Sequence, residues 1–478
     1  MAKSDQGSKD SHHEEDNEHY RRFRKQSGNE NPKEKHGHEL PGIGNVSTTG
    51  VIYCTDRATA LGYKADDEEW ANFGQGAPET GHLPGAPDKP TTIEVTDAMR
   101  EYAPTAGLTE LRTAVADLYN DLYRKDKSSQ YSWENVCIVP GGRAGLVRVA
   151  AMLSESFLGF FVPDYTAYTD VLSLFKGFVS IPGILEEDDS YKIHPDLVRN
   201  EIKRGISVIL TSNPRNPTGQ MVRDDELKEV MDICQGHATL IMDEFYSGYN
   251  YTSNCDGSTN SSAAFVEDVN EDGIVIIDGL TKTLRLPGWR VCWVVGPKQM
   301  IKGLASSGSF LDGGASHPLQ CAAIPLLEPK RYREDVIALQ KHFMKKRDYV
   351  LDRLAKMGLR VQVPPEATFY IWLDLSKLPK GIRDGMSFFE ECLKEKVIVV
   401  PGVFFDINPS HRRNLAASTC HHFVRLSFGP SMDHLVKGLD GIERVLKKHE
   451  HDMDEVEHGP SATQRLAQKK EQEGRMDR

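Results

Sequence analysis

Short apolar runs alternate with helical patterns through the middle of the chain. From Leu108 to Leu122, apolar residues recur at steps of three and four, which is the spacing of an amphipathic helix. The runs between such stretches are brief and often β-branched, as in strands that are buried on both faces of a sheet. This alternation predicts an α/β fold in which helices flank a mostly parallel central sheet. The expected strands are 136–139, 157–162, 208–210, 239–242 and 273–277.

The remaining segments predict a second, smaller α+β domain. A long helix is expected at 335–354, and the apolar runs at 369–373, 397–400 and 423–428 have the character of strands. The polar, aliphatic-poor ends of the chain cannot bury enough apolar surface to offset the entropy of ordering them. The predicted division is a disordered tail at 1–44, part of the small domain at 45–95, the large domain at 96–330, the rest of the small domain at 331–450 and a polar tail at 451–478.

Composition and charge exclude several classes of protein. The formal net charge of −12 argues against a nucleic-acid binder, which would present a basic face. The N-terminal residues contain no apolar signal-peptide core, and no run approaches the roughly 18 apolar residues that span a bilayer. The eight cysteines lack metal-like spacing and are expected to be reduced thiols. We therefore expect a cytoplasmic protein without a metal, membrane or nucleic-acid partner.

Unusual residues gather after the expected strands, where the ligands of parallel sheets bind. Gly141 and Gly142 follow a strand and open a helix, where backbone N–H groups and the helix dipole attract a phosphate. A glycine turn without a ligand is the alternative. Residues 213–219, Asn-Pro-Arg-Asn-Pro-Thr-Gly, follow another strand. Their composition predicts a rigid, extended loop rather than an ordinary connection.

Charged residues after later strands add further chemistry. Asp243 ends a strand and can pair with a cationic ring nitrogen, although helix capping explains it equally well. Lys282 can form an imine with an aldehyde cofactor, and Arg290 lies beyond a Pro-Gly turn from which it can reach a phosphate. Arg425 is flanked by apolar residues in a strand, so it needs a partner. That partner is either a substrate carboxylate or an internal acid.

These motifs together resemble those of the class I/II aminotransferases, which are enzymes of fold type I that depend on pyridoxal 5′-phosphate (PLP) and include aspartate aminotransferase. Residues 281–290 resemble the family's Ser/Thr-Lys-x-x-x-x-Pro-Gly-x-Arg signature, and 213–219 resemble Asn-Pro-x-Asn-Pro-Thr-Gly. The similarity extends over about residues 70–430, with all motifs in the family's order. It implies PLP as the cofactor and a homodimer with shared active sites.

The resemblance assigns roles around the cofactor ring. Lys282 would carry the cofactor as a Schiff base and move a proton between the substrate Cα and the cofactor. Asp243 would keep the pyridine nitrogen protonated. Tyr246 and Asn216 would hydrogen-bond to the phenolic oxygen, and Tyr165 would stack on the ring.

The resemblance also assigns contacts to the phosphate and the substrate. Arg425, with Asn216 and the backbone near Gly76, would bind the substrate α-carboxylate. Gly279 departs from the family, because many relatives have a phosphate-binding serine there, and relatives often have Ser or Thr near Arg143. The implied phosphate ligands are Gly141, Gly142, Arg143, Thr281 and Arg290, with Tyr102 reaching in from the neighbouring subunit.

Transamination between an amino acid and a 2-oxo acid is the expected reaction. The alternatives are a PLP-dependent lyase or synthase of the same fold, of the aminocyclopropane-carboxylate-synthase type, and a non-catalytic PLP-binding protein. The joint presence of Lys282, Asp243 and Arg425 disfavours the non-catalytic alternative, and the short N-terminal tail disfavours a PLP-dependent transcriptional regulator. Asp312 is a candidate for selecting a basic substrate and His317 for lining the site, although turn capping is the simpler interpretation of Asp312.

Overall fold

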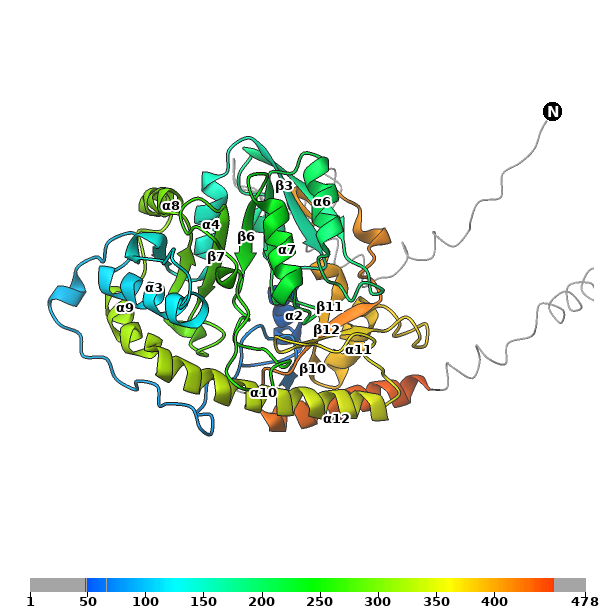
Figure 1. Ribbon diagram of the computed structural model, residues 1–478. Helices are drawn as coiled ribbons and strands as arrows, with labels where there is room; N and C mark the ends of the chain where they lie inside the picture. Colours follow the sequence, from blue (N-terminus) through cyan, green and yellow to red (C-terminus); the bar gives the residue numbers. More distant parts are fainter. Residues whose placement is uncertain (1–47, 49, 66, 451–478) are drawn as a thin grey trace, which may run out of the picture.

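The structure, a computed structural model, describes residues 48–450 except 49 and 66 (Figure 1). The tails predicted at 1–44 and 451–478 lie outside the described residues. Within the described part of the chain, no helix is both long enough and apolar enough to cross a membrane. All eight cysteines are free thiols, and most are buried.

A seven-stranded sheet with the order β2-β8-β7-β6-β5-β3-β4 forms the centre of the fold. Strand β8 is antiparallel to both of its neighbours, whereas the other pairs in this sheet are parallel. The predicted mostly parallel sheet is therefore confirmed. The strands that the sequence predicted are β2 Val136–Val139, β3 Ser156–Val162, β5 Val208–Ser212, β6 Thr239–Asp243 and β7 Ile274–Gly279.

Two strands of this sheet were not predicted from the sequence. Strand β4, Phe178–Ile184, lies at the edge of the sheet and contains Pro182 and Gly183. Edge strands tolerate such residues, but the sequence then lacks a continuous apolar run. Strand β8, Cys292–Val295, has only four residues and follows almost directly on the loop that contains Arg290.

Helices flank the central sheet, as predicted (Figure 1). Helix α3, Thr109–Tyr123, buries Leu111, Val115 and Leu118 at the spacing that the sequence indicated. Helix α4 packs against α8, and α6 packs against α7. The bounds of the other helices here are α4 Gly142–Met152, α5 Tyr168–Val171, α6 Pro195–Lys203, α7 Asp224–Cys234, α8 Lys298–Leu311 and α9 His317–Ala323.

Two small sheets form the predicted smaller α+β domain. One is antiparallel, with the order β11-β12-β9, and the other is the parallel pair β1-β10. The single strand predicted at 397–400 is instead divided between these sheets, because β10 and β11 pair with different partners. The bounds are β1 Ala71–Asn72, β9 Tyr370–Asp374, β10 Val397–Ile398, β11 Val400–Pro401 and β12 Phe423–Ser427.

Helices α2 Gly50–Thr59, α11 Gly385–Lys394 and α12 Met432–His449 contact these small sheets. Helix α10, Pro329–Lys356, is longer than the predicted 335–354 and runs along the lower edge of the molecule in Figure 1. It contacts α3 at one side and α12 at the other. Strand β1 lies early in the described chain and β10 lies late in it, and the two pair with each other. The N-terminal and C-terminal segments therefore both contribute to the small sheets. The boundaries predicted at 95 and 330 stay predictions.

Candidate active site

A cavity of about 500 Å³ lies at the carboxyl ends of strands β5, β6 and β7. Its other walls come from the segment after β1, from helix α2 and from strands β9 and β12. This is the position that ligands occupy in parallel sheets. The sequence-predicted residues that line it are Gly76, Gly142, Arg143, Tyr165, Asn216, Asp243, Tyr246, Thr281, Lys282, Arg290 and Arg425.

Lys282 lies in the loop after β7, inside the cavity, and its ammonium donates to the backbone oxygen of Gly76. Burial, assisted by the positive charge of Arg425, lowers the pKa of Lys282 to about 7. The nitrogen lies 5.8 Å from the centre of the Tyr246 ring. A buried amine with a lowered pKa has the properties of a lysine nucleophile rather than of a surface charge.

Asp243 ends strand β6 and faces the same cavity. Its Oδ2 accepts a hydrogen bond of 2.8 Å from the hydroxyl of Tyr168, which is itself fully buried. Burial raises the pKa of Asp243 to about 7, and the Tyr168 hydrogen bond and the charge of Lys282 oppose that rise. Asp243 does not cap a helix, because a turn rather than a helix follows β6. The helix-capping alternative is therefore wrong.

Gly141, which precedes α4, and Gly142, its first residue, leave room for an anion. A side chain at Gly141, whose φ is +103°, would begin 1.8 Å from the Arg290 guanidinium. A side chain at Gly142 would begin 2.4 Å from the ring of Phe245. The backbone at the N-terminus of α4 and the Arg290 guanidinium therefore flank one glycine-walled cradle, whose donors fit a phosphate group.

The departure at Gly279 has a steric explanation. A side chain at Gly279 would begin 2.5 Å from the Cys292 sulfur on neighbouring strand β8. That sulfur lies 3.2 Å from the Thr281 hydroxyl. Cys292 thus fills the space beside Thr281, and a serine at position 279 would require it to move.

Arg425 reaches the cavity from strand β12 and is buried. It donates to the Asn216 Oδ1 at 2.9 Å and to the Gly74 backbone oxygen at 2.8 Å. Its guanidinium carbon lies 4.1 Å from the centre of the Tyr370 ring. Among the described residues its Nε has no hydrogen-bond partner and no acid forms an ion pair with it. The internal salt bridge is therefore not found among the described residues, and the positive charge of a guanidinium that lines the cavity is not neutralised by an acid.

Four of the predicted residues have other contacts than the sequence led us to expect. Arg143 does line the cavity, but its Nε donates to the Tyr165 hydroxyl at 3.1 Å. Tyr102 is 95% exposed and does not line the cavity. Asp312 pairs with the buried Arg148, whose Nε lies 2.8 Å from its Oδ2, and also caps the backbone of Gly314. His317 bonds to the Glu101 backbone instead of lining the cavity. The structure favours the capping interpretation of Asp312.

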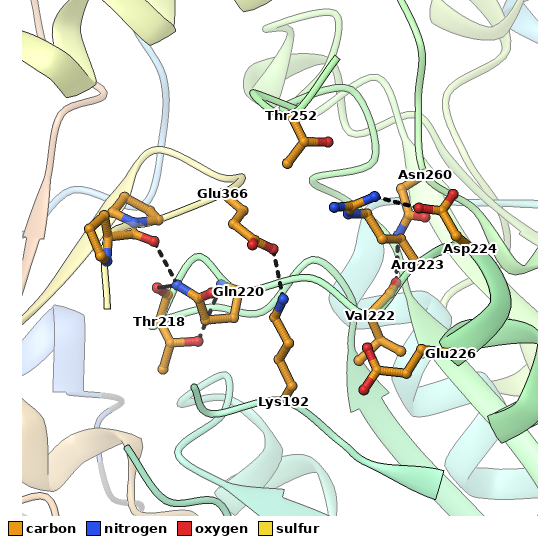
Figure 2. Close-up of polar contacts among 12 residues, drawn as sticks. Lys192, Thr218, Gln220, Val222, Arg223, Asp224, Glu226, Thr252, Asn260 and Glu366 are labelled. Carbon is orange, nitrogen blue, oxygen red and sulfur yellow. Dashed lines mark hydrogen bonds and ion pairs between the residues drawn. The ribbon is translucent and has the colours of Figure 1, made fainter. Parts of the chain in front are cut away.

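The loop that carries Asn216 is fastened to the smaller part of the fold. The Gly219 carbonyl accepts hydrogen bonds from the backbone of Glu366 and Ala367. The Gln220 side chain donates to the Pro364 carbonyl at 2.9 Å. Figure 2 shows the ion pair of 3.0 Å between Lys192 and Glu366 beside Gln220. The bonds of Gly219 and Gln220 hold the loop against the segment that precedes strand β9.

Sequence reasoning missed several residues of the site. Tyr168 follows Tyr165, the tyrosine predicted to stack on the cofactor ring, at a helical spacing, so the sequence did contain a signal for it. Tyr370 gives no such signal, yet its hydroxyl lies 2.8 Å from that of Tyr246. Two other cavity residues, Val51 and Thr55, lie on helix α2, which no local pattern connects with the site. The remaining ones stand in or beside segments that the sequence did indicate, and they are Asn72, Gln75, Ala77, Leu146, Thr166, Ser212, Phe245 and Pro287.

The fold and the site define a PLP-dependent enzyme of fold type I. Residues 68–434 match the family described as aminotransferase class I and II. The chain belongs to this family and is an aminotransferase. The curated relatives that it resembles are named as aminotransferases, so the lyase alternative is not favoured.

Individual relatives are distant in sequence but cover most of the chain. The aspartate aminotransferase of Bacillus subtilis is 26% identical, over 76% of this chain and 90% of that protein. A probable N-acetyl-LL-diaminopimelate aminotransferase of the same organism is 29% identical, over 77% and 86%. The structure of aspartate aminotransferase from Thermus thermophilus with maleate has a TM-score of 0.68 at 23% identity, over 84% of this chain and 97% of that one. That structural likeness concerns the fold.

Proposed function

We propose that this aminotransferase attaches its cofactor to Lys282 and holds the carboxylate of its substrate with Arg425. The observation that supports this most is that buried Arg425, which forms no ion pair with an acid among the described residues, lines the same cavity as the Lys282 amine. A bound α-amino acid can then present its carboxylate to the guanidinium and its Cα to the lysine. Two parallel N–H···O bonds are the usual form of such a contact.

The other cavity residues support the same assignment. PLP, when bound, supplies an electron-accepting ring next to the substrate Cα. The Asp243 carboxylate would accept the hydrogen of the ring nitrogen, and Tyr246 and Asn216 would bond the phenolic oxygen. Tyr165 would cover the ring face and shield it from water. Gly141, Gly142, Arg143, Thr281 and Arg290 would hold the phosphate.

Lys282 should capture an aldehyde at neutral pH. An ordinary lysine is a neutral amine in only roughly one molecule in a thousand at about pH 7.4. With a pKa of about 7, Lys282 is neutral in a large fraction of molecules. The rate of PLP attachment to the cofactor-free protein should therefore rise from about pH 6 and level off above about pH 7.5. Borohydride trapping followed by mass measurement would follow this rate, and a rate that keeps rising to pH 10 would contradict it.

Replacing Arg425 with alanine should raise KM for every α-amino acid by roughly 10-fold to 150-fold, because a charge-assisted contact of about 1.5–3 kcal/mol is lost. Steady-state kinetics would measure this change. Several relatives are named for aspartate, so aspartate is the first donor to test. The matched control is the amine that corresponds to the amino acid without its α-carboxylate. Its slow reaction should have the same rate in the wild type and in Arg425→Ala. An effect confined to one amino acid would assign Arg425 to the substrate side chain instead.

A homodimer with shared active sites and a cytoplasmic location complete the proposal. Tyr102 is an almost fully exposed aromatic residue, and Phe310 is 71% exposed. Exposed aromatic residues of this size are typical of surfaces that a partner covers. In a dimer, Tyr102 would reach the phosphate cradle of the other subunit. Sedimentation of the wild-type protein and of Tyr102→Ala would test the assembly, and a monomeric active enzyme would contradict it.

A further inference from the structure

A buried ion pair lies behind the cavity. Arg215, in the loop that carries Asn216, donates to the Asp164 Oδ2 at 2.6 Å. It also donates to the Pro163 carbonyl at 3.1 Å and to the Thr211 hydroxyl at 2.7 Å. Both members of the pair are buried, and neither lines the cavity. Buried charges of this kind are costly unless they have a partner, so each depends on the other.

The pair is connected directly to the strand end that carries Asp243. Asp164 accepts hydrogen bonds from the backbone and the hydroxyl of Ser212. Ser212 is the register partner of Asp243 between strands β5 and β6. The next residue, Asn213, donates its backbone N–H to the Asp243 carbonyl at 2.9 Å. Asp164 is thus bonded to Ser212, the residue that pairs with Asp243 across the two strands. Arg215 is the cation that neutralises Asp164.

Asp243 faces a surplus of negative groups. Asp164, Glu244 and Asp278 all interact with it, and all are fully buried acids. From α5, the Tyr168 hydroxyl donates to Asp243, and from the loop after β7, Lys282 supplies the facing positive charge. The field of Arg215 also reaches Tyr168. One further uncompensated negative charge behind Asp243 would favour its neutral form.

We propose that Arg215 is a positioning residue that pairs with Asp164 and thereby keeps Asp243 available as a carboxylate for the ring nitrogen of the cofactor. The inference rests on the proposed role of Asp243. The pair also anchors the loop through Thr211 and Pro163, but the electrostatic role makes a prediction that anchoring does not. Removal of Arg215 and removal of Asp164 should change the ionisation of Asp243 in opposite directions.

The test measures how tightly the cofactor-free protein binds pyridoxamine 5′-phosphate at pH values from about 5 to 9. This probe has no aldehyde, so it does not react with Lys282, and equilibrium dialysis gives its affinity without any turnover. The affinity falls where Asp243 takes up a proton. In Arg215→Gln the midpoint of this fall should move up by about one pH unit, and in Asp164→Asn it should move down. The double variant Asp164→Asn/Arg215→Gln should return close to the wild-type midpoint.

Arg215→Gln leaves Asp164 buried without its positively charged partner, so this variant is the one most exposed to misfolding. If it does not fold, the comparison of Asp164→Asn with the double variant replaces it. The two differ only in Arg215, and the midpoint should lie about one pH unit lower where the arginine is present. Equal midpoints would overturn the proposal.

Gln220→Ala is the matched control for anchoring. It loosens the same loop by removing the bond to the Pro364 carbonyl, but it changes no charge (Figure 2). Its midpoint should equal that of the wild type. A shift in Gln220→Ala as large as that in Arg215→Gln, or shifts of the same sign in the two single charge variants, would mean that the pair acts only by holding the loop. A wild-type protein that binds no pyridoxamine 5′-phosphate would instead overturn the proposed function itself.

Discussion

Replacing Lys282 with alanine should lower kcat by roughly three orders of magnitude or more, because the group that moves the proton and attaches the cofactor is lost. The Lys282 amine is buried in the cavity together with Asp243 and Arg425. The variant should still bind PLP without a covalent bond, since the glycine cradle and Arg290 are unchanged. Single-turnover absorbance with a saturating amino acid, together with denaturing mass measurement after borohydride treatment, would show both effects.

Two controls separate the chemistry of Lys282 from its charge. Lys282→Arg keeps a cation in the cavity but cannot supply a neutral amine at neutral pH, so it should be as inactive as the alanine variant. Lys192→Ala removes a lysine whose ion pair with Glu366 lies outside the cavity. It should retain covalent labelling and most of the activity. Normal turnover in Lys282→Ala would exclude the proposed role.

Replacing Asp243 with asparagine should lower kcat by roughly two to three orders of magnitude. The change keeps the shape and the acceptor for Tyr168 but removes the charge that would face the ring nitrogen. Breaking one side of a buried charged pair costs about 3–5 kcal/mol. Steady-state kcat at saturating substrate measures the loss, because the missing interaction strengthens as the ring accepts electrons.

Asp278→Asn is the matched control for this variant. Asp278 is also a fully buried acid at the end of a central strand, where it accepts from Ser247 and from the backbone of Gly279. It does not line the cavity. We therefore expect its asparagine variant to retain kcat within a few-fold. Equal losses in the two variants would mean that Asp243 acts through fold stability rather than through the cofactor.

Much of the fold was predictable because local chemistry reports local structure. The apolar runs that became β2, β3, β5, β6 and β7 are buried along most of their length, so their shortness and their β-branched or aromatic composition indicate strands. Edge strand β4 is exposed in part, so its composition does not distinguish it. The division of 397–400 between two sheets depends on which partners its neighbours find, which no local pattern contains.

The site was predictable as a set of residues but not as an arrangement. The sequence indicated that Arg425 needs a partner, whereas Asn216, Gly74 and the ring of Tyr370 are partners that only folding brings together. Asp312 shows the reverse case. From the sequence, this carboxylate was a candidate for selecting a basic substrate. In the structure it instead forms an ion pair with the buried Arg148.

The sequence by itself determined which residue types stand at the carboxyl ends of the strands: glycines where a side chain would close the cradle, a lysine and an aspartate after neighbouring strands, and an arginine in a buried strand. Only the tertiary structure decided their ionisation and their partners. Burial lowers the pKa of Lys282 and raises that of Asp243 to about the same value. Such shifts depend on the loss of surrounding water and on charges such as Arg425 and Asp164, which come from separate segments of the chain.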